Sequence, residues 1–120
     1  MAATKLINQY NLATGNLLSD AIPEVGDLVV HIKVSGATTD KKVKYTLKAK
    51  DGDSDYDNVR NIDVQSGDPR SIQFVTYGNA GYRETINSIQ AEFVKILVEP
   101  ETGADGMLDL WYTKADKTTL

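Results

Sequence analysis

The chain contains no cysteine, only three prolines, one histidine and one tryptophan in 120 residues. Without cysteine it can have neither a disulfide scaffold nor a thiolate metal site, so a hydrophobic core has to stabilise the fold. The longest uncharged apolar runs extend over a few residues. A helix that crosses a bilayer needs roughly 20 such residues, so the sequence predicts no membrane span.

The first residues also lack the pattern of a secretory signal, because no long apolar stretch follows Lys5. We therefore expect synthesis and retention in a cytoplasm. The 13 basic and 17 acidic residues give a net charge of -4. Nucleic-acid binding depends on a concentrated basic surface, so this balance argues against a nucleic-acid partner. A local basic patch stays an alternative, formed by Lys41, Lys42, Lys44, Lys48 and Lys50.

Alternation of polar and apolar residues is the dominant pattern that is present. In Lys42–Lys50, lysines alternate with Val43, Tyr45, Leu47 and Ala49. The segment Asp27–Ser35 alternates in the same way, with its even-numbered residues apolar. A period of two residues is typical of a strand with one buried face.

Further candidate strands are short, rich in β-branched or aromatic residues, and bounded by turn formers. They are Ser71–Tyr77, Glu92–Glu99 and Gly106–Lys114, with weaker candidates at Lys5–Asn11, Asn61–Val64 and Tyr82–Ile86. No segment of ten residues has a helical stripe, although Ser88–Glu92 could form one helical turn. Seven to eight strands predict an all-β fold, an antiparallel β-sandwich or jelly roll.

The strands belong to one domain, because the chain has no repeat and no long linker. We expect the β-sandwich at 15–114, a flexible tail at 115–120, and an edge strand or arm at 1–14. The N-terminal third is expected to break twice, at Ala13–Asn16 and at Ile22–Gly26. The residues predicted to share one core are Val30, Ile32, Tyr45, Leu47, Ile96 and Val98.

Trp111 and Tyr112 are adjacent, so only one of them can face the core of a strand. Trp111 shares its parity with Met107, whereas Leu108 and Leu110 share the other parity. We predict Trp111 inside and Tyr112 outside.

Four aspartates at alternate positions form the most site-like cluster, and they are Asp51, Asp53, Asp55 and Asp57. Counted from Asp51, an EF-hand would need a glycine where Tyr56 stands and a glutamate where Ile62 stands. The EF-hand motif therefore fails. A looser calcium site stays an alternative, but turn-forming residues after a lysine-rich strand favour a mobile turn without a bound ion.

No other part of the sequence resembles a catalytic motif. His31 is the single histidine, the chain has no Gly-x-Ser-x-Gly elbow, and Ser35 and Ser54 stand in turn-like contexts. No glycine-rich loop has the spacing of a phosphate site. We predict no catalytic residue, no cofactor and no enzymatic activity.

Residues 17–114 resemble small β-sandwich domains encoded among the virion structural genes of tailed bacteriophages. The matching segments are Leu18–Ile22, Tyr45–Tyr56, Phe93–Val98 and the closing strand Gly106–Lys114. In this sequence Tyr56 replaces the tryptophan that often follows the Asp-Gly turn in relatives. The resemblance implies a non-enzymatic virion protein, a capsid-decorating, head-fibre or tail-associated subunit whose partners are other virion proteins.

A carbohydrate-binding β-sandwich module for host attachment is the alternative function. Such a module needs exposed aromatic rings that lie together, and the residues proposed for glycan contact are Tyr77, Tyr82 and Tyr112.

We also expect the chain to form a homo-oligomer, because an open sandwich has unpaired strand edges. The uncharged segment with Leu6, Ile7 and Tyr10 is predicted to pair with a neighbouring subunit. The alternative is that this segment closes its own sheet.

Overall fold

A computed structural model describes residues 3–62 and 69–116, and these residues form an all-β, antiparallel, sandwich-like fold. The strands are β1 (Thr4–Asn11), β2 (Leu17–Leu18), β3 (Ile22–Ser35), β4 (Lys42–Lys50), β5 (Asp57–Asn58), β6 (Arg60–Ile62), β7 (Pro69–Ser71), β8 (Gln73–Tyr77), β9 (Ala80–Ile86), β10 (Ala91–Pro100) and β11 (Met107–Asp116). One 3-10 turn, η1 (Leu12–Thr14), follows β1. The count exceeds the predicted seven to eight because four of the strands have only two or three residues.

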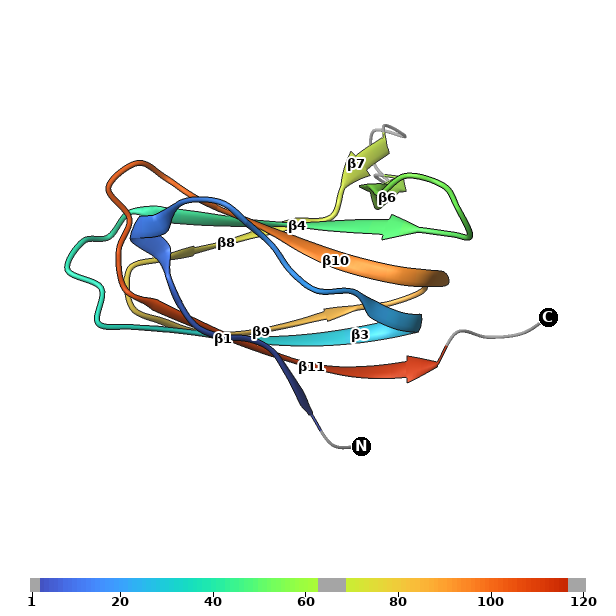
Figure 1. The fold of residues 1–120 in the computed structure, drawn as a ribbon, viewed down its shortest axis with the longest axis horizontal. Coiled ribbons are helices and arrows are strands. Elements are labelled where there is room, and N and C mark those ends of the chain that lie inside the picture. Colours follow the sequence, from blue (N-terminus) through green and yellow to red (C-terminus); the bar gives the residue numbers. More distant parts are fainter. Residues whose placement is uncertain (1–2, 63–68, 117–120) are drawn as a thin grey trace.

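The strands lie in two layers, which Figure 1 shows edge-on. In the first layer β4 pairs with β8 and β5 on one side and with β10 on the other, and β10 also pairs with β2. In the second layer the order is β1, β11, β3, β9. The pair β6–β7 forms a separate two-stranded sheet.

Strand β3 belongs to both layers. Its start, Ile22–Val25, pairs with β10 of the first layer, and Leu28–Val34 pairs with β9 and β11 of the second. The backbone bends where the first part ends: Glu24 has φ 51°, and the Gly26 carbonyl accepts a hydrogen bond from the Ile89 amide. The predicted break at Ile22–Gly26 is therefore a bend within a continuous strand.

A single hydrophobic core lies between the layers. All six residues predicted for it are fully buried, which confirms the face assignment of β3, β4 and β10. In the core the Tyr45 ring stacks on Phe74, and its hydroxyl hydrogen-bonds Thr76 at 2.9 Å. Burial raises the pKa of Tyr45 to about 12, and the hydrogen bond with Thr76 offsets part of this rise.

The prediction for Trp111 and Tyr112 was wrong. Leu108 and Leu110 are fully buried, and Tyr112, which has the same parity, packs against the core. Trp111 has the parity of Met107, which is 37% exposed, and both lie on the outer face of the second layer. Two leucines thus outweigh one methionine in setting which side of β11 faces inward.

Two further expectations are corrected. Ser88 and Gln90 have φ values of 61° and 54°, so Ser88–Glu92 cannot form a right-handed helical turn. Residues 115 and 116 belong to β11 and not to a tail, while 117–120 lie outside the described residues. The strand expected at Asn61–Val64 is represented by β6, and its last two residues also lie outside the described residues.

Candidate functional site

The four aspartates after β4 are spread along a turn and a short strand. Asp51 accepts a hydrogen bond from the Glu92 amide at 2.9 Å, and its carbonyl accepts one from the Ser54 amide. Asp53 and Asp55 are exposed, and Asp57 lies in β5 opposite Ala49. Among the described residues, no three acidic or histidine side chains are grouped so that they could hold a metal ion.

The three tyrosines proposed for glycan contact do not form one platform. Tyr77 is 59% exposed and points outward from the first layer, because its strand buries Phe74 and Thr76 instead. Tyr82 lies opposite the buried Ile32, on the inner side of the second layer, and stacks on Phe74.

The hydroxyl of Tyr82 donates a hydrogen bond to Glu84 at 2.8 Å. This bond raises the pKa of Tyr82, and burial adds to the effect. Tyr112 lies opposite Val30, two strands away from β9. Each tyrosine therefore has a different environment.

The N-terminal segment is an edge strand of its own sheet, since β1 pairs with β11 of the same chain. Ile7 is 4% exposed, and Leu6 and Tyr10 pack against the core. The side chains proposed for self-association are thus used within their own chain. Association of copies through another surface stays a prediction.

Asp109 fixes the irregular part of β1. The pairing of β1 with β11 shifts register twice, and Gln9 lies there with φ 49°. The Asp109 carboxylate accepts a hydrogen bond from the Gln9 backbone amide at 2.8 Å. It also forms an ion pair with the Lys5 ammonium at 2.9 Å. Burial alone would raise the pKa of Asp109, but the bonds from Lys5 and Gln9 outweigh it and lower the pKa.

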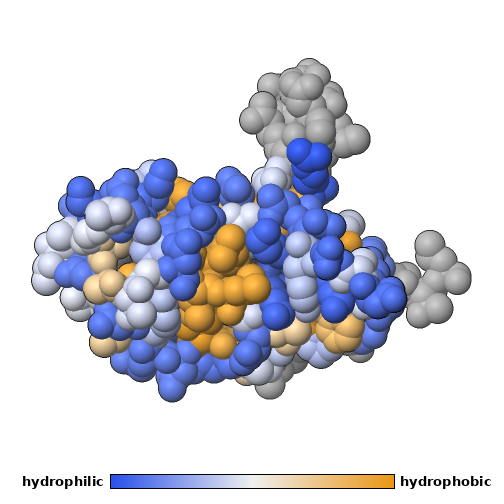
Figure 2. Space-filling view, turned by 45° about the horizontal axis from the view of Figure 1, so that its top comes forward, coloured by the Kyte–Doolittle hydropathy of each residue, from blue (hydrophilic) through white to orange (hydrophobic). Residues whose placement is uncertain are grey.

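The outer face of the first layer combines lysines with an apolar patch. Lys42, Lys44, Lys48 and Lys50 alternate along β4, and Lys95 lies opposite Lys48. Leu18, which is 45% exposed, lies opposite Leu97. Figure 2 shows a hydrophobic patch at the centre of a largely hydrophilic face.

Thr46 lies between Leu97 and Gln73 on this outer face, yet it is only 3% exposed. Its hydroxyl has no hydrogen-bond partner within the described part of the chain. A buried hydroxyl without a partner is destabilising, so its neighbours on this face shield it from water at some cost to stability.

A groove of about 320 Å³ begins at the same patch. It is lined by residues 6–11 of the β1 region and residues 17–20 around β2, and Leu18 belongs to both the groove and the patch. The groove runs along the open edge of the sandwich, where β1 and β2 are the outermost strands of their layers. Edge strands have free backbone groups that another chain can pair with.

The outer face of the second layer has a pocket of about 220 Å³, lined by Ala3, Val29, His31, Arg83, Trp111, Tyr112 and Thr113. Sequence reasoning missed this site because its residues come from β3, β9, β11 and the residue before β1, which are distant from one another in the chain. The sequence does contain one indication of it. If Leu108 and Leu110 face the core, Trp111 has to point to the outer face of the same strand.

Among the described residues no helix is long and apolar enough to cross a membrane. No family model, curated protein or solved structure matches the chain.

Proposed function

We propose that this protein is a non-enzymatic structural subunit of a tailed-bacteriophage virion that attaches to another virion protein. The observation that carries the proposal is the apolar patch of Leu18 and Leu97, which continues into the groove between β1 and β2. Single exposed apolar side chains are common on protein surfaces, whereas contiguous patches with a polar rim mark interaction sites. The resemblance of residues 17–114 to virion β-sandwiches supplies the class of partner.

The charges around the patch define the partner more closely. Five lysines share the outer face of the first layer. Among the described residues, one of them forms an ion pair, which joins Lys44 to Glu99 at 3.7 Å. Complementary potentials set which partner is accepted and how fast it associates. The docking surface on the partner should therefore have an apolar centre with an acidic rim.

The aromatic ring of Tyr56 shields one end of this face. The ammonium groups of Lys95 and Lys50 lie 4.8 and 5.6 Å from its ring centroid. Such cation–π contacts offset the repulsion between neighbouring lysines. This leaves the end nearer to Lys42 and Lys44 as the more open part of the basic surface.

Mass spectrometry of purified virus particles tests the proposed class directly. The expected result is that the chain is present in many copies per particle and is retained after density-gradient purification. Particles that contain none of it would contradict the assignment to the virion.

Binding to particles that lack the protein tests the docking surface. We expect Leu18→Asp to weaken co-sedimentation about tenfold or more, because it places a charge at the centre of the patch. The matched control is Met107→Asp, which makes the same kind of change at a 37% exposed apolar residue on the outer face of the other layer. Equal binding by both variants would show that the patch is not the docking surface.

A further inference from the structure

We propose that the pocket on the outer face of the second layer binds a sugar ring with a carboxylate group, of the uronic-acid or sialic-acid type. This site lies on the opposite layer from the apolar patch, and it shares only Tyr112 with the three tyrosines considered above. The inference therefore goes beyond the proposed role in the virion.

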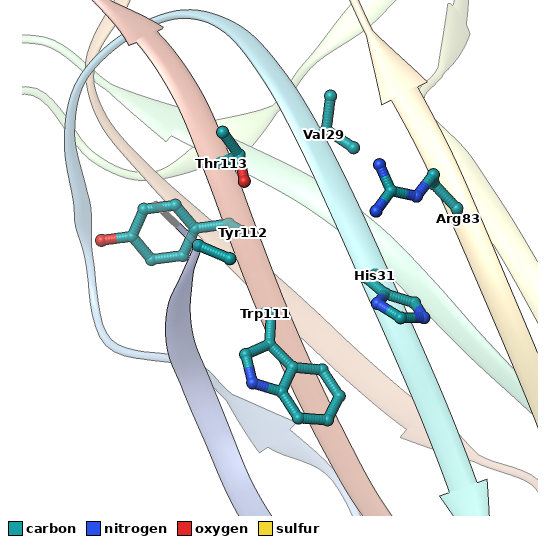
Figure 3. A pocket seen from close by; sticks show the side chains of 7 residues that line it. Val29, His31, Arg83, Trp111, Tyr112 and Thr113 are labelled. Atoms are coloured by element: carbon teal, nitrogen blue, oxygen red, sulfur yellow. The ribbon is translucent and has the colours of Figure 1, made fainter. Parts of the chain in front are cut away.

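Four side chains form a row across the second layer. Lys5 lies opposite Trp111, Trp111 opposite His31, and His31 opposite Arg83, so that β1, β11, β3 and β9 each contribute one residue. Residues directly opposite each other on neighbouring antiparallel strands point to the same side of the sheet. Figure 3 shows Trp111, His31 and Arg83 around the pocket, with Val29 and Thr113 beside them.

The indole of Trp111 is held in place from both sides. The Lys5 ammonium lies 4.9 Å from its ring centroid, and the His31 ring lies 5.6 Å away at an angle of 37°. Lys5 is itself fixed by the buried Asp109. A ring that is positioned in advance loses little freedom when a ligand packs on it, and the C–H groups of a sugar pack well on aromatic surface.

Arg83 supplies the charge that a carboxylate would meet. Within the described residues no acidic side chain forms an ion pair with it, and its side chain is exposed. In Figure 3 the Arg83 guanidinium extends from β9 towards β3, between Val29 and His31. The planar guanidinium matches a carboxylate with two parallel hydrogen bonds, so it selects anions by shape as well as by charge.

The surroundings reinforce this preference although the whole chain has a net charge of -4. Lys33 also points outward from β3, next to the row, and the negative charge of Asp109 is already paired with Lys5. Arg83 and Lys33 thus place two positive charges beside the pocket that form no ion pair among the described residues. Local potential, and not the net charge, determines which ligands concentrate at a cleft.

The size of the pocket limits the ligand. Pockets for drug-sized molecules have volumes of roughly 300–1,000 Å³. At about 220 Å³ this pocket suits one ring rather than an extended oligosaccharide. Val29 and Ala3 provide apolar walls, and Thr113 provides a hydroxyl that can hydrogen-bond a sugar hydroxyl.

Fluorescence gives a direct test, because Trp111 is the only tryptophan in the chain. Glucuronate and glucose form a matched pair of ligands that differ by the carboxylate. We expect a saturable change in Trp111 emission with glucuronate and an affinity at least about tenfold lower for glucose. Equal responses to both sugars, or no change in either emission or backbone amide shifts of His31 and Thr113, would overturn the proposal.

Variants assign the effect to the pocket. Arg83→Gln should remove the preference for glucuronate, and Arg83→Lys should restore part of it. Lys48→Gln removes one positive charge from the other layer and should leave binding unchanged. If Lys48→Gln weakens binding as much as Arg83→Gln, the sugar responds to overall charge and the pocket is not its site.

Two further ligands separate the possible sources of the sugar. N-acetylneuraminate and a trisaccharide that ends in the same sugar have the same terminal ring. Both should bind if the site recognises the terminal residue of a glycan. Binding of inorganic phosphate with the same affinity as glucuronate would show a simple anion site and would contradict the sugar class.

Discussion

The outer faces of the two layers differ in how their residues are assembled. On the first layer four of the five lysines alternate along a single strand, β4. On the second layer Lys5, Trp111, His31 and Arg83 come from four strands, one residue each. A surface built along one strand can be recognised in the sequence, whereas a surface built across strands appears only when the register is known.

The faces also differ in how they are anchored. The second layer has β1 fixed on β11 by the buried Asp109, and this strand positions Lys5 beside Trp111. On the first layer the ion pair of Lys44 with Glu99 is longer, and both side chains are partly exposed. We therefore expect the second face to depend on its polar contacts and the first face to depend on the core beneath it.

The largest expected effect comes from Leu47→Ala in the fully buried side of β4. It should lower the free energy of unfolding by about 2–5 kcal/mol through lost burial and a residual cavity. Denaturant unfolding should be followed by circular dichroism and by Trp111 fluorescence, which reports on the second layer. Coincident midpoints are expected, and separate midpoints would show that the two layers do not share one core.

Asp109→Asn should lower the free energy of unfolding by about 2 kcal/mol, because hydrogen bonds to a charged group are lost at a buried position. The matched change in the first layer, Glu99→Gln, should have an effect below about 0.5 kcal/mol, as is usual for exposed ion pairs. Similar losses in the two variants would contradict the difference in anchoring.

The pH dependence of the Asp109 contribution follows from its lowered pKa. A carboxyl group whose pKa is lowered in the folded state contributes its full stabilisation at pH values above its pKa in the unfolded chain, which is near 4. This contribution is lost as the pH falls through the pKa of the folded state. The stability difference between the natural chain and Asp109→Asn should therefore shrink in acid. A difference that stays constant down to pH 2 would argue against the charge as its cause.

Tyr45→Phe should lower the free energy of unfolding by about 1 kcal/mol, because the hydroxyl of Thr76 loses its partner. The Tyr45 pKa is raised from 10.0 to about 12, so its contribution to stability is present below pH 10 and is lost as pH rises towards 12. Urea unfolding between pH 9 and 12 should show this loss in the natural chain. The part that comes from Tyr45 should be missing in Tyr45→Phe.

The smallest effects are expected at the faces themselves. Arg83→Gln and Leu18→Asp change exposed side chains, one on each layer, and each should shift the free energy of unfolding by less than about 0.5 kcal/mol. Thermal melts of both variants check this. A loss above 1 kcal/mol in either would mean that the residue serves the fold, and its binding result would then need another variant.

Much of the fold could be predicted because alternation reveals both the strand and its buried face. The segments around Val30 and Tyr45 alternate most clearly, and Glu92–Glu99 has three apolar residues at even positions against two at odd ones. The inner faces of all three were predicted correctly. In β11 both parities contain apolar residues, so the sequence could not decide between Trp111 and Tyr112. The decision depends on tertiary packing, since Leu108 and Leu110 face the core.

The candidate sites were less predictable for a related reason. The aspartates at 51–57 are close together in sequence, but they have separate structural roles. Asp51 accepts a hydrogen bond in a turn, and Asp57 pairs with β4 in the short strand β5. By contrast, Lys5 and Trp111 are far apart in sequence and meet only through the pairing of β1 with β11. Closeness in sequence is thus a poor guide to a site on a sheet, where neighbours come from other strands.

The passage of β3 through both layers has a consequence for how the molecule could work. Neither layer is a continuous piece of the chain, because β3 supplies its start to one and its remainder to the other. No fragment can present one outer face without the other, and the two faces keep a fixed distance and opposite directions. A partner on the proposed docking surface and a sugar in the proposed pocket would therefore be held on opposite sides of one folded unit.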